Sequence, residues 1–526
     1  MSKTLRAAQR RDSGARSKQL IRANVKSWLL HIICVAALMW TPLANGQAFF
    51  FYDTSNYIRA ADIALYLGSN KKVSTVWTDR YSDQLSSENS KTNEIGAPSP
   101  GAKFEPSHNN ISAGLVMSGR SPYIGALMFL AYLLSNFWLF VILQAAISYF
   151  LIFLVLRQFG IEDATRRTIT TLALAGATAV SYYNGLLLAD AFAAFGTLSF
   201  LILASKMPLT KIETTALAAI IATSAVSHLT NIVILATLVG GTALLVMLRV
   251  MPKPPLRAWI FGIGAVALGF LSIQLTALAT EAALGKKPQL LPLFTARFIA
   301  DGPGLEYIKS GCEGNRYQIC RVKIGAVDNA SVILSGREPG VGTYLQANST
   351  EQLKMGEEDT AFAWSVFRSY PLAQTRAIVR NTFAQLTWVE YTGLNVGCFD
   401  KEKCWSNLPA PVREQLQHSL SGRNAWPEHY LEPIQRSAML LSLIMLFIVA
   451  LRKEQMKQSH WRVLRSWLIL TGLTMLAVAG FGGGIVEPQY RYITRVAWLL
   501  PFFALVGVFI LSWQRFQISD PRGDRI

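Results

Sequence analysis

The sequence predicts an all-α, multi-pass membrane protein with about ten transmembrane helices and a mixed extracytoplasmic segment. Only 16% of its 526 residues are charged and 51% are hydrophobic, whereas about a quarter of the residues in soluble proteins are charged. The hydrophobic residues form blocks of about 15 to 25 residues, the length that crosses a bilayer as a helix. The net charge of +18 is a weak sign of nucleic acid binding, because the basic residues lie in short segments between these blocks.

Ten hydrophobic blocks are predicted to span the membrane, near residues 28–47, 137–156, 168–184, 187–205, 214–228, 231–248, 258–279, 434–451, 466–483 and 494–513. Residues 1–27 contain eight Lys or Arg and one acid, so the positive-inside rule places this tail in the cytoplasm. The same rule puts the tail 514–526 on that side. We therefore expect both termini in the cytoplasm. The chain has no obvious eukaryotic retention signal, and we expect a bacterial inner membrane.

The N-terminus allows a second interpretation. A basic region, a hydrophobic stretch and the sequence Gly46-Gln47-Ala48 together also fit a cleavable signal peptide. The long basic tail and the continuation of the hydrophobic run through Phe49 and Phe51 favour an uncleaved first span.

Two segments between the spans are too long to be turns, and both fall on the outer side of the membrane. Residues 28–279 form an N-terminal transmembrane module, predicted to be catalytic, with an outer loop at 48–121. Residues 280–433 form an extracytoplasmic segment with an amphipathic helical pattern at 373–389, and residues 434–513 form the C-terminal transmembrane helices.

Four of the five cysteines, Cys312, Cys320, Cys398 and Cys404, lie in the extracytoplasmic segment. An even number of cysteines in an oxidising compartment predicts disulfides. Three pairings are open, and the local pairs 312–320 and 398–404 are favoured because short loops close easily. A zinc site is the alternative, but no His lies at ligand spacing. Cys34, within the first span, is expected to be a buried apolar side chain.

Charged and polar side chains gather at the predicted outer ends of the spans. Ionisable groups near lipid are costly and tend to mark function. The residues concerned are Asp53, Arg120, Asp190, His228, Thr230, Asn231, Arg297, Asp301, Glu487, Tyr490, Arg491 and Tyr492.

This mixture of carboxylates and arginines indicates a particular chemistry. A carboxylate can deprotonate an acceptor hydroxyl or hold a metal ion. Arginine binds phosphate through paired hydrogen bonds. A site at the outer interface could therefore take a lipid-phosphate headgroup while the lipid tail stays in the bilayer, which suggests group transfer from a lipid-linked donor.

Each residue taken alone also has a structural interpretation. Asp53 could be solvated at the interface, Asp190 could cap its helix, and His228 could be a turn residue. Arg120 could extend towards the headgroups, and Asp62 is expected to be solvated on a helix. Only the joint pattern favours a functional site.

One span is followed by an early acid, an Arg-Ser-Pro-Tyr helix start, a span ending in Leu-Arg-Gln-Phe-Gly, an acid at a later helix end and Glu-x-x-x-Arg-Tyr before the final span. This order resembles the GT-C superfamily of integral membrane glycosyltransferases, which includes protein mannosyltransferases and the aminoarabinose transferases of lipid A. The resemblance covers the layout of residues 28–250 and 480–513. It implies a polyprenyl-phosphate sugar as donor and a reaction on the outer side of the membrane.

In the family, an acid in the first outer loop is the catalytic base or lies next to it, and Asp53 matches that place, so the resemblance implies that Asp53 is the catalytic base. Many members have two adjacent acids there, whereas Thr54 follows Asp53 in this chain. Some members hold a divalent cation with such acids, so the single acid weakens the metal prediction and leaves a divalent cation open as cofactor.

Further residues are expected to bind the substrate or its phosphate. Arg120 and Tyr123 match the family's basic residue and aromatic residue at an interfacial helix, and Arg491 with Tyr492 matches a pair before the final helix. The full expected set is Arg120, Tyr123, Asp190, Arg297, Glu487, Arg491 and Tyr492.

The expected function is transfer of a hexosyl or pentosyl group from a polyprenyl-phosphate donor to an envelope polysaccharide, glycolipid or protein on the periplasmic face. The partners are the donor lipid, the bilayer and the acceptor, without nucleic acid. A polysaccharide polymerase or ligase is the main alternative. A transporter is less favoured, because interrupted helices and repeated halves are not evident, and a non-enzymatic envelope assembly protein would not need the gathered charges.

Overall fold

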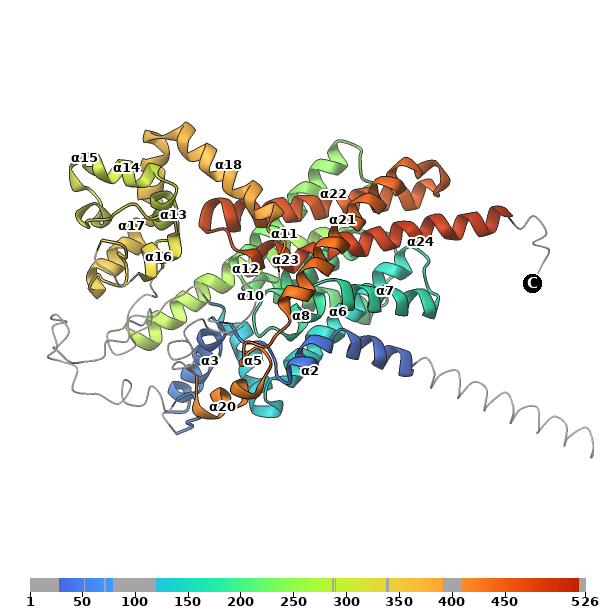
Figure 1. Ribbon diagram of the computed structural model, residues 1–526, viewed down its shortest axis with the longest axis horizontal. Helices are drawn as coiled ribbons and strands as arrows, with labels where there is room; N and C mark the ends of the chain where they lie inside the picture. Colours follow the sequence, from blue (N-terminus) through green and yellow to red (C-terminus); the bar gives the residue numbers. More distant parts are fainter. Residues whose placement is uncertain are drawn as a thin grey trace, which may run out of the picture.

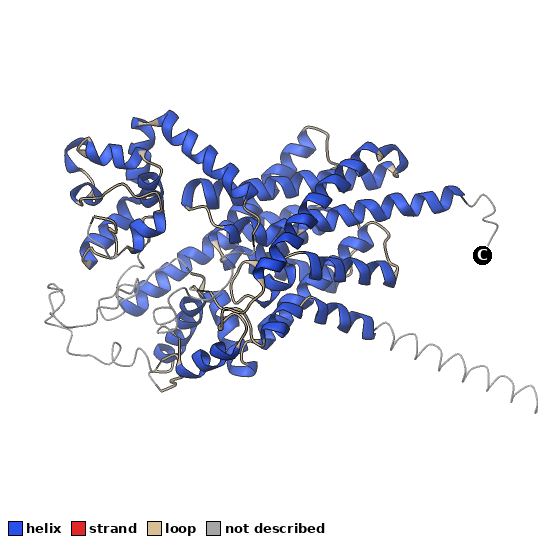
Figure 2. Ribbon diagram, in the orientation of Figure 1, coloured by secondary structure: helices blue, strands red, loops and turns tan. Residues whose placement is uncertain are grey.

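The computed structural model describes residues 28–51, 53–70, 72–78, 120–285, 288, 290–336, 340–390 and 408–519. Within these ranges every regular element is a helix, and the only strand-like pairing is an isolated bridge between Phe49 and Leu186 (Figures 1 and 2). The all-α prediction is confirmed for this part of the chain.

Six of the described helical segments are long and apolar enough to cross a membrane. They are α6 Trp138–Gln158, α11 Leu229–Met247, α12 Leu256–Leu284, α21 Glu428–Leu451, α22 Gln458–Val478 continued by the π-helix η4 Ala479–Val486, and α23 Tyr490–Ala497 continued by α24 Leu499–Ser519. These segments support a multi-pass membrane protein.

The other four predicted spans coincide with shorter helices. The first is the helix Trp28–Ala37 followed by α2 Trp40–Asn45. The others are α7 Ala164–Ala177 with α8 Val180–Gly185, α9 Ala191–Ala204 and α10 Lys211–Ser227. The total of about ten spans therefore remains a prediction.

Helix α9 lies at the centre of the bundle. All of its residues are buried. Its 14 residues are about 21 Å long at 1.5 Å per residue, shorter than the hydrocarbon core of about 30 Å. If Ala204 lies at one membrane surface, the Asp190 end does not reach the opposite surface. It is then surrounded by neighbouring helices.

A separate group of helices forms an outer domain at one end of the bundle (Figure 1). It contains α13 Leu293–Ala300, α14 Pro303–Lys309, α15 Cys312–Asn315, η2 Gln318–Arg321, α16 Ala330–Ser335, α17 Ser349–Ser369 and α18 Pro371–Thr387. Helices α13 to α17 enclose their own hydrophobic core, which includes Phe298, Tyr307, Tyr344 and Phe362. Helix α18 is the amphipathic helix predicted at 373–389.

The predicted disulfide between Cys312 and Cys320 is present in this domain. Cys398 and Cys404 lie outside the described residues. Cys34 is a free, buried cysteine, as predicted.

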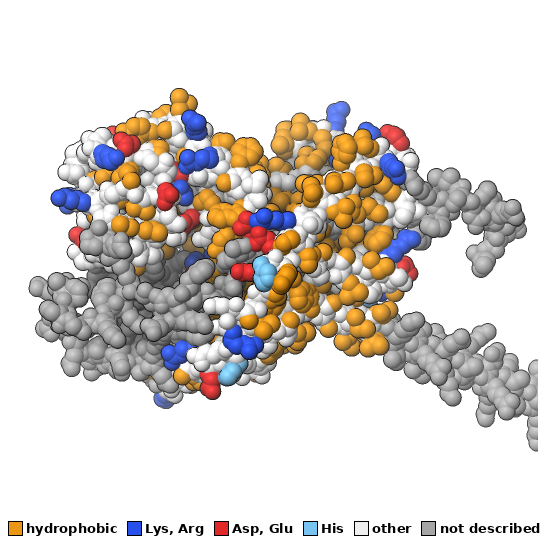
Figure 3. All heavy atoms as spheres, in the orientation of Figure 1, with side chains coloured by type: hydrophobic (Ala, Val, Ile, Leu, Met, Phe, Trp, Pro, Cys, Tyr) orange, Lys and Arg blue, Asp and Glu red, His pale blue; other side chains and the backbone are white. Residues whose placement is uncertain are grey.

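The helix Trp28–Ala37 and the C-terminal end of α24 lie at the end of the bundle opposite the outer domain (Figure 1). Hydrophobic side chains cover much of the visible bundle surface, whereas charges of both signs are spread over the outer domain (Figure 3). This division suits a bundle that is surrounded by lipid and a domain that stands in water. We call the end of the bundle beside the outer domain the domain end.

Candidate functional site at the domain end of the bundle

The candidate site forms where four segments meet at the domain end. Asp53 precedes α3 Thr54–Gly68, Arg120 precedes α5 Pro122–Ser135, and Asp190 stands at the start of α9. Arg491 and Arg495 lie one turn apart on α23. We call these five residues the charge cluster.

Backbone pairing near Leu186 brings the first of these segments, which carries Asp53, against the stretch that leads into α9. The Phe49 N–H donates to the Gly185 carbonyl at 2.8 Å, and the Leu187 N–H donates to the Phe49 carbonyl at 2.9 Å. The Thr54 hydroxyl donates to the Leu187 carbonyl at 2.9 Å. These bonds pair the backbone N–H and C=O groups of the extended stretch between α8 and α9, which have no helical partners.

The two carboxylates share one arginine. Asp53 Oδ1 lies 2.6 Å from Arg120 Nη2, and Asp53 Oδ2 lies 3.3 Å from Arg491 Nη2. Asp190 Oδ2 lies 3.7 Å from Arg491 Nη1, and Asp190 Oδ1 lies 3.1 Å from Arg495 Nη1. Arg491 therefore links the first loop to α9.

The cluster is mostly buried and carries an excess of positive charge. The side chains of Arg491, Arg495 and Asp190 are 7%, 1% and 6% exposed, while those of Asp53 and Arg120 are 17% and 31% exposed. Three guanidinium groups thus face two carboxylates. Nε and Nη2 of Arg495 are buried without a hydrogen-bond partner, although buried donors are normally paired.

The pKa of Asp53 reflects this excess. Burial raises the pKa of the carboxyl, but the nearby Arg120 and Arg491 outweigh that effect, so the pKa lies below its usual range. Asp53 is consequently ionised at neutral pH and can accept a proton only weakly. Burial also raises the pKa of the Tyr57 hydroxyl to about 12, which keeps that residue neutral.

Several contacts hold Arg491 in position. Its Nε donates to Gln489 Oε1 at 3.1 Å, and its carbonyl accepts from the Tyr183 hydroxyl at 3.0 Å. Its guanidinium carbon lies 4.5 Å from the centre of the Phe51 ring. A guanidinium that is stacked and bonded on several sides keeps one orientation.

The backbone of Gln489 is in turn held by α18. The Gln489 N–H donates to Gln385 Oε1 at 2.7 Å, and Gln385 Nε2 donates to the Gln489 carbonyl at 2.8 Å. The outer domain is therefore connected to Arg491 through one buried amide side chain.

Asp53, Arg120, Asp190 and Arg491, all predicted site residues, meet in the cluster. Tyr492 lies beside it, with its ring centre 5.2 Å from the Arg491 guanidinium carbon and 5.3 Å from that of Arg495. His228 caps α11 by accepting the Thr230 N–H at 3.2 Å on Nδ1, which agrees with its interpretation as a turn residue.

Three other predicted site residues lie elsewhere. Arg297 pairs with the buried Asp301 at 2.6 Å inside the outer domain. Glu487 accepts a hydrogen bond from Ser331 on α16. Tyr123 is 42% exposed, with its hydroxyl 3.4 Å from a backbone carbonyl of α12.

Two features were not expected from the sequence. Arg495 was not among the predicted site residues, although an arginine within a final hydrophobic span is itself a signal of function. The prediction that Asp62 is solvated is wrong. Asp62 is 1% exposed and accepts hydrogen bonds from the Thr75 and Thr78 hydroxyls at 2.5 and 2.6 Å, which closes the loop after α3.

Among the described residues, no group of three or more His, Cys, Asp and Glu is arranged to hold a metal ion. The two cluster carboxylates are already held by arginines. The role of a divalent cation therefore gains no support from this part of the chain.

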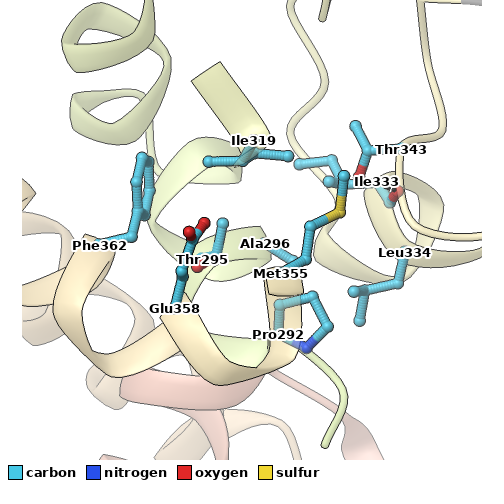
Figure 4. Close-up of a pocket in the computed structure, with 10 residues that line it drawn as sticks. All are labelled: Pro292, Thr295, Ala296, Ile319, Ile333, Leu334, Thr343, Met355, Glu358 and Phe362. Atoms are coloured by element: carbon cyan, nitrogen blue, oxygen red, sulfur yellow. Dashed lines mark hydrogen bonds between the residues drawn. The ribbon is translucent and has the colours of Figure 1, made fainter. Parts of the chain in front are cut away.

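A cavity in the outer domain is distinct from the cluster (Figure 4). Its lining is mainly apolar, with Ile319, Met355 and Phe362 around one carboxylate, Glu358. The Glu358 carboxylate accepts a hydrogen bond from the Gln318 N–H at 2.6 Å, so it already has a partner within the domain.

Comparisons of the chain with protein-family models, with curated proteins and with solved structures found no match.

Proposed function

We propose that the chain is a membrane glycosyltransferase that moves a hexosyl or pentosyl group from a polyprenyl-phosphate donor to an envelope acceptor. The acceptor is a polysaccharide, a glycolipid or a protein. In this proposal the domain end faces the periplasm, the bundle lies in the inner membrane of a bacterium, and both termini are cytoplasmic.

The observation that carries the proposal is the charge balance of the cluster. Three arginines and two aspartates leave one positive charge, and Arg495 has buried donors without partners. A buried, unbalanced charge is costly unless a partner arrives. The phosphodiester of a polyprenyl-phosphate sugar carries one negative charge and several acceptor oxygens, so it would complete the cluster.

The position of the cluster supports a lipid-linked donor. Asp190 stands at the end of a short helix in the middle of an apolar bundle, and Asp53 and Arg120 come from segments at its edge. A donor with its phosphate among these arginines could keep its polyprenyl chain in the surrounding lipid.

In the proposed reaction the acceptor oxygen attacks C1 of the sugar from the side opposite the phosphate. The acceptor O–H proton passes to the Asp53 carboxylate, the new C1–O bond forms, and the bond between C1 and the phosphate oxygen breaks. The released polyprenyl phosphate takes the bonding electrons, and arginines stabilise the added charge. The sugar is transferred with inversion.

The ion pairs of Asp53 have a consequence for this step. Arg120 and Arg491 lower its basicity while the phosphate is absent. When a phosphate takes over part of their hydrogen bonding, the carboxylate loses stabilisation and its basicity rises. Donor binding would therefore prepare the base.

The same ion pairs favour one alternative, a polysaccharide polymerase or ligase that uses a lipid-pyrophosphate donor. A carboxylate with a lowered pKa is a weak base, and in that alternative the arginines act without it. Retained activity in Asp53→Asn, together with lost activity in Arg491→Met, would favour the alternative.

Donor binding tests the charge argument. Arg495→Met is compared with wild type for binding of a short-chain polyprenyl phosphate in detergent. A hydrogen bond to a charged group contributes about 1.5 to 3 kcal/mol. We therefore expect Arg495→Met to bind the lipid phosphate about 10- to 150-fold more weakly than wild type. Arg436→Met is the matched control, because Arg436 has two ion pairs but is 56% exposed. Equal affinity of Arg495→Met and wild type would contradict the proposal.

A further inference from the structure

Helix α18 of the outer domain buries three amide side chains against the rest of the protein. Gln374 Nε2 donates to Asp301 Oδ2 at 2.9 Å, and Asn381 Nδ2 donates to Asp301 Oδ1 at 2.8 Å. Gln385 binds the backbone of Gln489. Gln374, Asn381 and Gln385 are 0%, 6% and 0% exposed, so this face is a polar interior.

The opposite face of α18 is hydrophobic and exposed. Leu372, Val379 and Phe383 are 86%, 47% and 65% exposed. Their spacing of seven and four residues places them in one row along the helix. A helix on a water-soluble surface normally has the reverse polarity, with apolar residues inside and polar residues outside. We call these three residues the α18 stripe.

The C-terminal half of α18 packs against the bundle. The helix runs obliquely from the outer domain to the bundle (Figure 1) and packs closely on the π-helix η4, which ends a membrane-spanning segment. A Cβ atom at Gly483 or Gly484 would lie 2.5 Å from Gln385 or Thr382, so only glycine permits this approach. The C-terminal half of α18 therefore lies against the bundle, and the stripe faces away from this contact.

The charges on α18 also suit a lipid surface. The helix contains Arg376 and Arg380 and no Asp or Glu. Both arginines are exposed, and they lie beside the stripe on the helical wheel. Basic residues beside an apolar row are typical of helices that lie in a membrane interface, where lipid phosphates meet the cations.

We propose that the α18 stripe is seated in the bilayer interface at the domain end. Phe383 would lie against acyl chains, and Arg376 would lie near lipid phosphates. The partner is phospholipid, and the proposal does not depend on the catalytic activity proposed above.

The oblique course of α18 also predicts an order of depth. Leu372 and Phe383 are 11 residues apart, which is about 16 Å along the axis. Because the C-terminal end of α18 adjoins the bundle, Phe383 should lie deepest and Leu372 nearest to water.

The test places an environment-sensitive fluorescent amino acid at position 383, 379 or 372 of the full chain in phospholipid vesicles. Lys309 on α14 is the control position, because its side chain is 59% exposed within the outer domain. Quenching by lipids brominated on the acyl chain is compared with quenching by iodide in water. Melting temperature and elution volume confirm that each variant is folded, and position 379 replaces 383 if that variant is not.

We expect brominated lipid to quench position 383 several-fold more than position 309, with position 372 between them, and iodide to show the reverse order. Quenching of 383 by iodide to the same extent as 309 would place the stripe in water and overturn the proposal. Protection of 383 from both quenchers would also overturn it, because another protein or a second copy would then cover the stripe.

Discussion

Replacing Arg491 with methionine should destabilise the bundle more than the loss of any exposed arginine. Arg491 lies 3.3 Å from Asp53 and 3.7 Å from Asp190. At an effective dielectric constant of about 20, each of these pairs attracts by about 4 to 5 kcal/mol before desolvation is counted. Removing one partner of a buried pair costs about 3 to 5 kcal/mol, because the remaining charge stays buried.

The lower part of this range applies here. Asp53 keeps Arg120 at 2.6 Å, and Asp190 keeps Arg495 at 3.1 Å. We therefore expect Arg491→Met to lower the free energy of unfolding by about 3 kcal/mol. The double variant Arg491→Met with Asp190→Asn should lose less than the sum of the single variants, because Asp190→Asn removes one of the carboxylates left without Arg491.

Chemical unfolding in detergent, followed by tryptophan fluorescence, measures these differences. Arg436→Met is the control, because Arg436 makes two ion pairs but its side chain is 56% exposed. Exposed ion pairs contribute about 0 to 1 kcal/mol to the free energy of unfolding. If Arg491→Met lost no more stability than Arg436→Met, the charge cluster could not be a buried electrostatic unit.

Three further changes test separate parts of the structure. Because the pKa of Asp53 is lowered, its ion pairs should stabilise the protein above the usual pKa of an aspartate, about 4. The advantage of wild type over Asp53→Asn should disappear as the pH falls through the folded-state pKa. Melting temperatures of the two proteins measured from pH 3 to 7 would not converge at low pH if the pairing were absent. Burial raises the pKa of Asp359 to about 6, so the folded state is favoured at low pH and loses stability as the pH rises through 6. Asp359→Asn should therefore stabilise the outer domain at pH 8 by up to about 3 kcal/mol. An equal gain in stability at pH 4 would refute this cause. Cys312→Ser should destabilise the outer domain by about 2 to 3 kcal/mol, which limited proteolysis of this domain measures. Faster cleavage of the membrane bundle as well would contradict an effect confined to the outer domain.

The membrane helices could be predicted because their signal is compositional. A block of apolar residues such as 137–156 has one stable arrangement in lipid, which is a helix, and α6 occupies it. The position of the Asp190 end of α9 within the bundle could not be predicted in this way. Its outer end depends on the bridge between Phe49 and Leu186, and residues that are so far apart in sequence leave no periodic pattern.

The meeting of Asp53, Arg120, Asp190 and Arg491 could be predicted from topology, because all four belong to the same end of the spans. Arg495 was missed because it lies inside the last hydrophobic block, where only the turn of α23 brings it to Asp190.

The predicted site residues outside the cluster show the limit of this reasoning. Arg297 lies on α13 and Asp301 directly follows that helix, four residues on, so they pair with each other and not with the cluster. The topology that placed them on the outer side could not distinguish the outer domain from the end of the bundle.

Sugar transfer by the full chain in membranes is the most direct measurement. Wild type and Asp53→Asn are expressed to matched levels, labelled polyprenyl-phosphate sugars are supplied, and the label is followed into envelope polysaccharides, glycolipids and proteins. We predict transfer by wild type and its loss in Asp53→Asn with the protein still folded. Equal transfer by both would remove Asp53 as the base, and absence of transfer by wild type from every donor would contradict the proposed glycosyltransferase function.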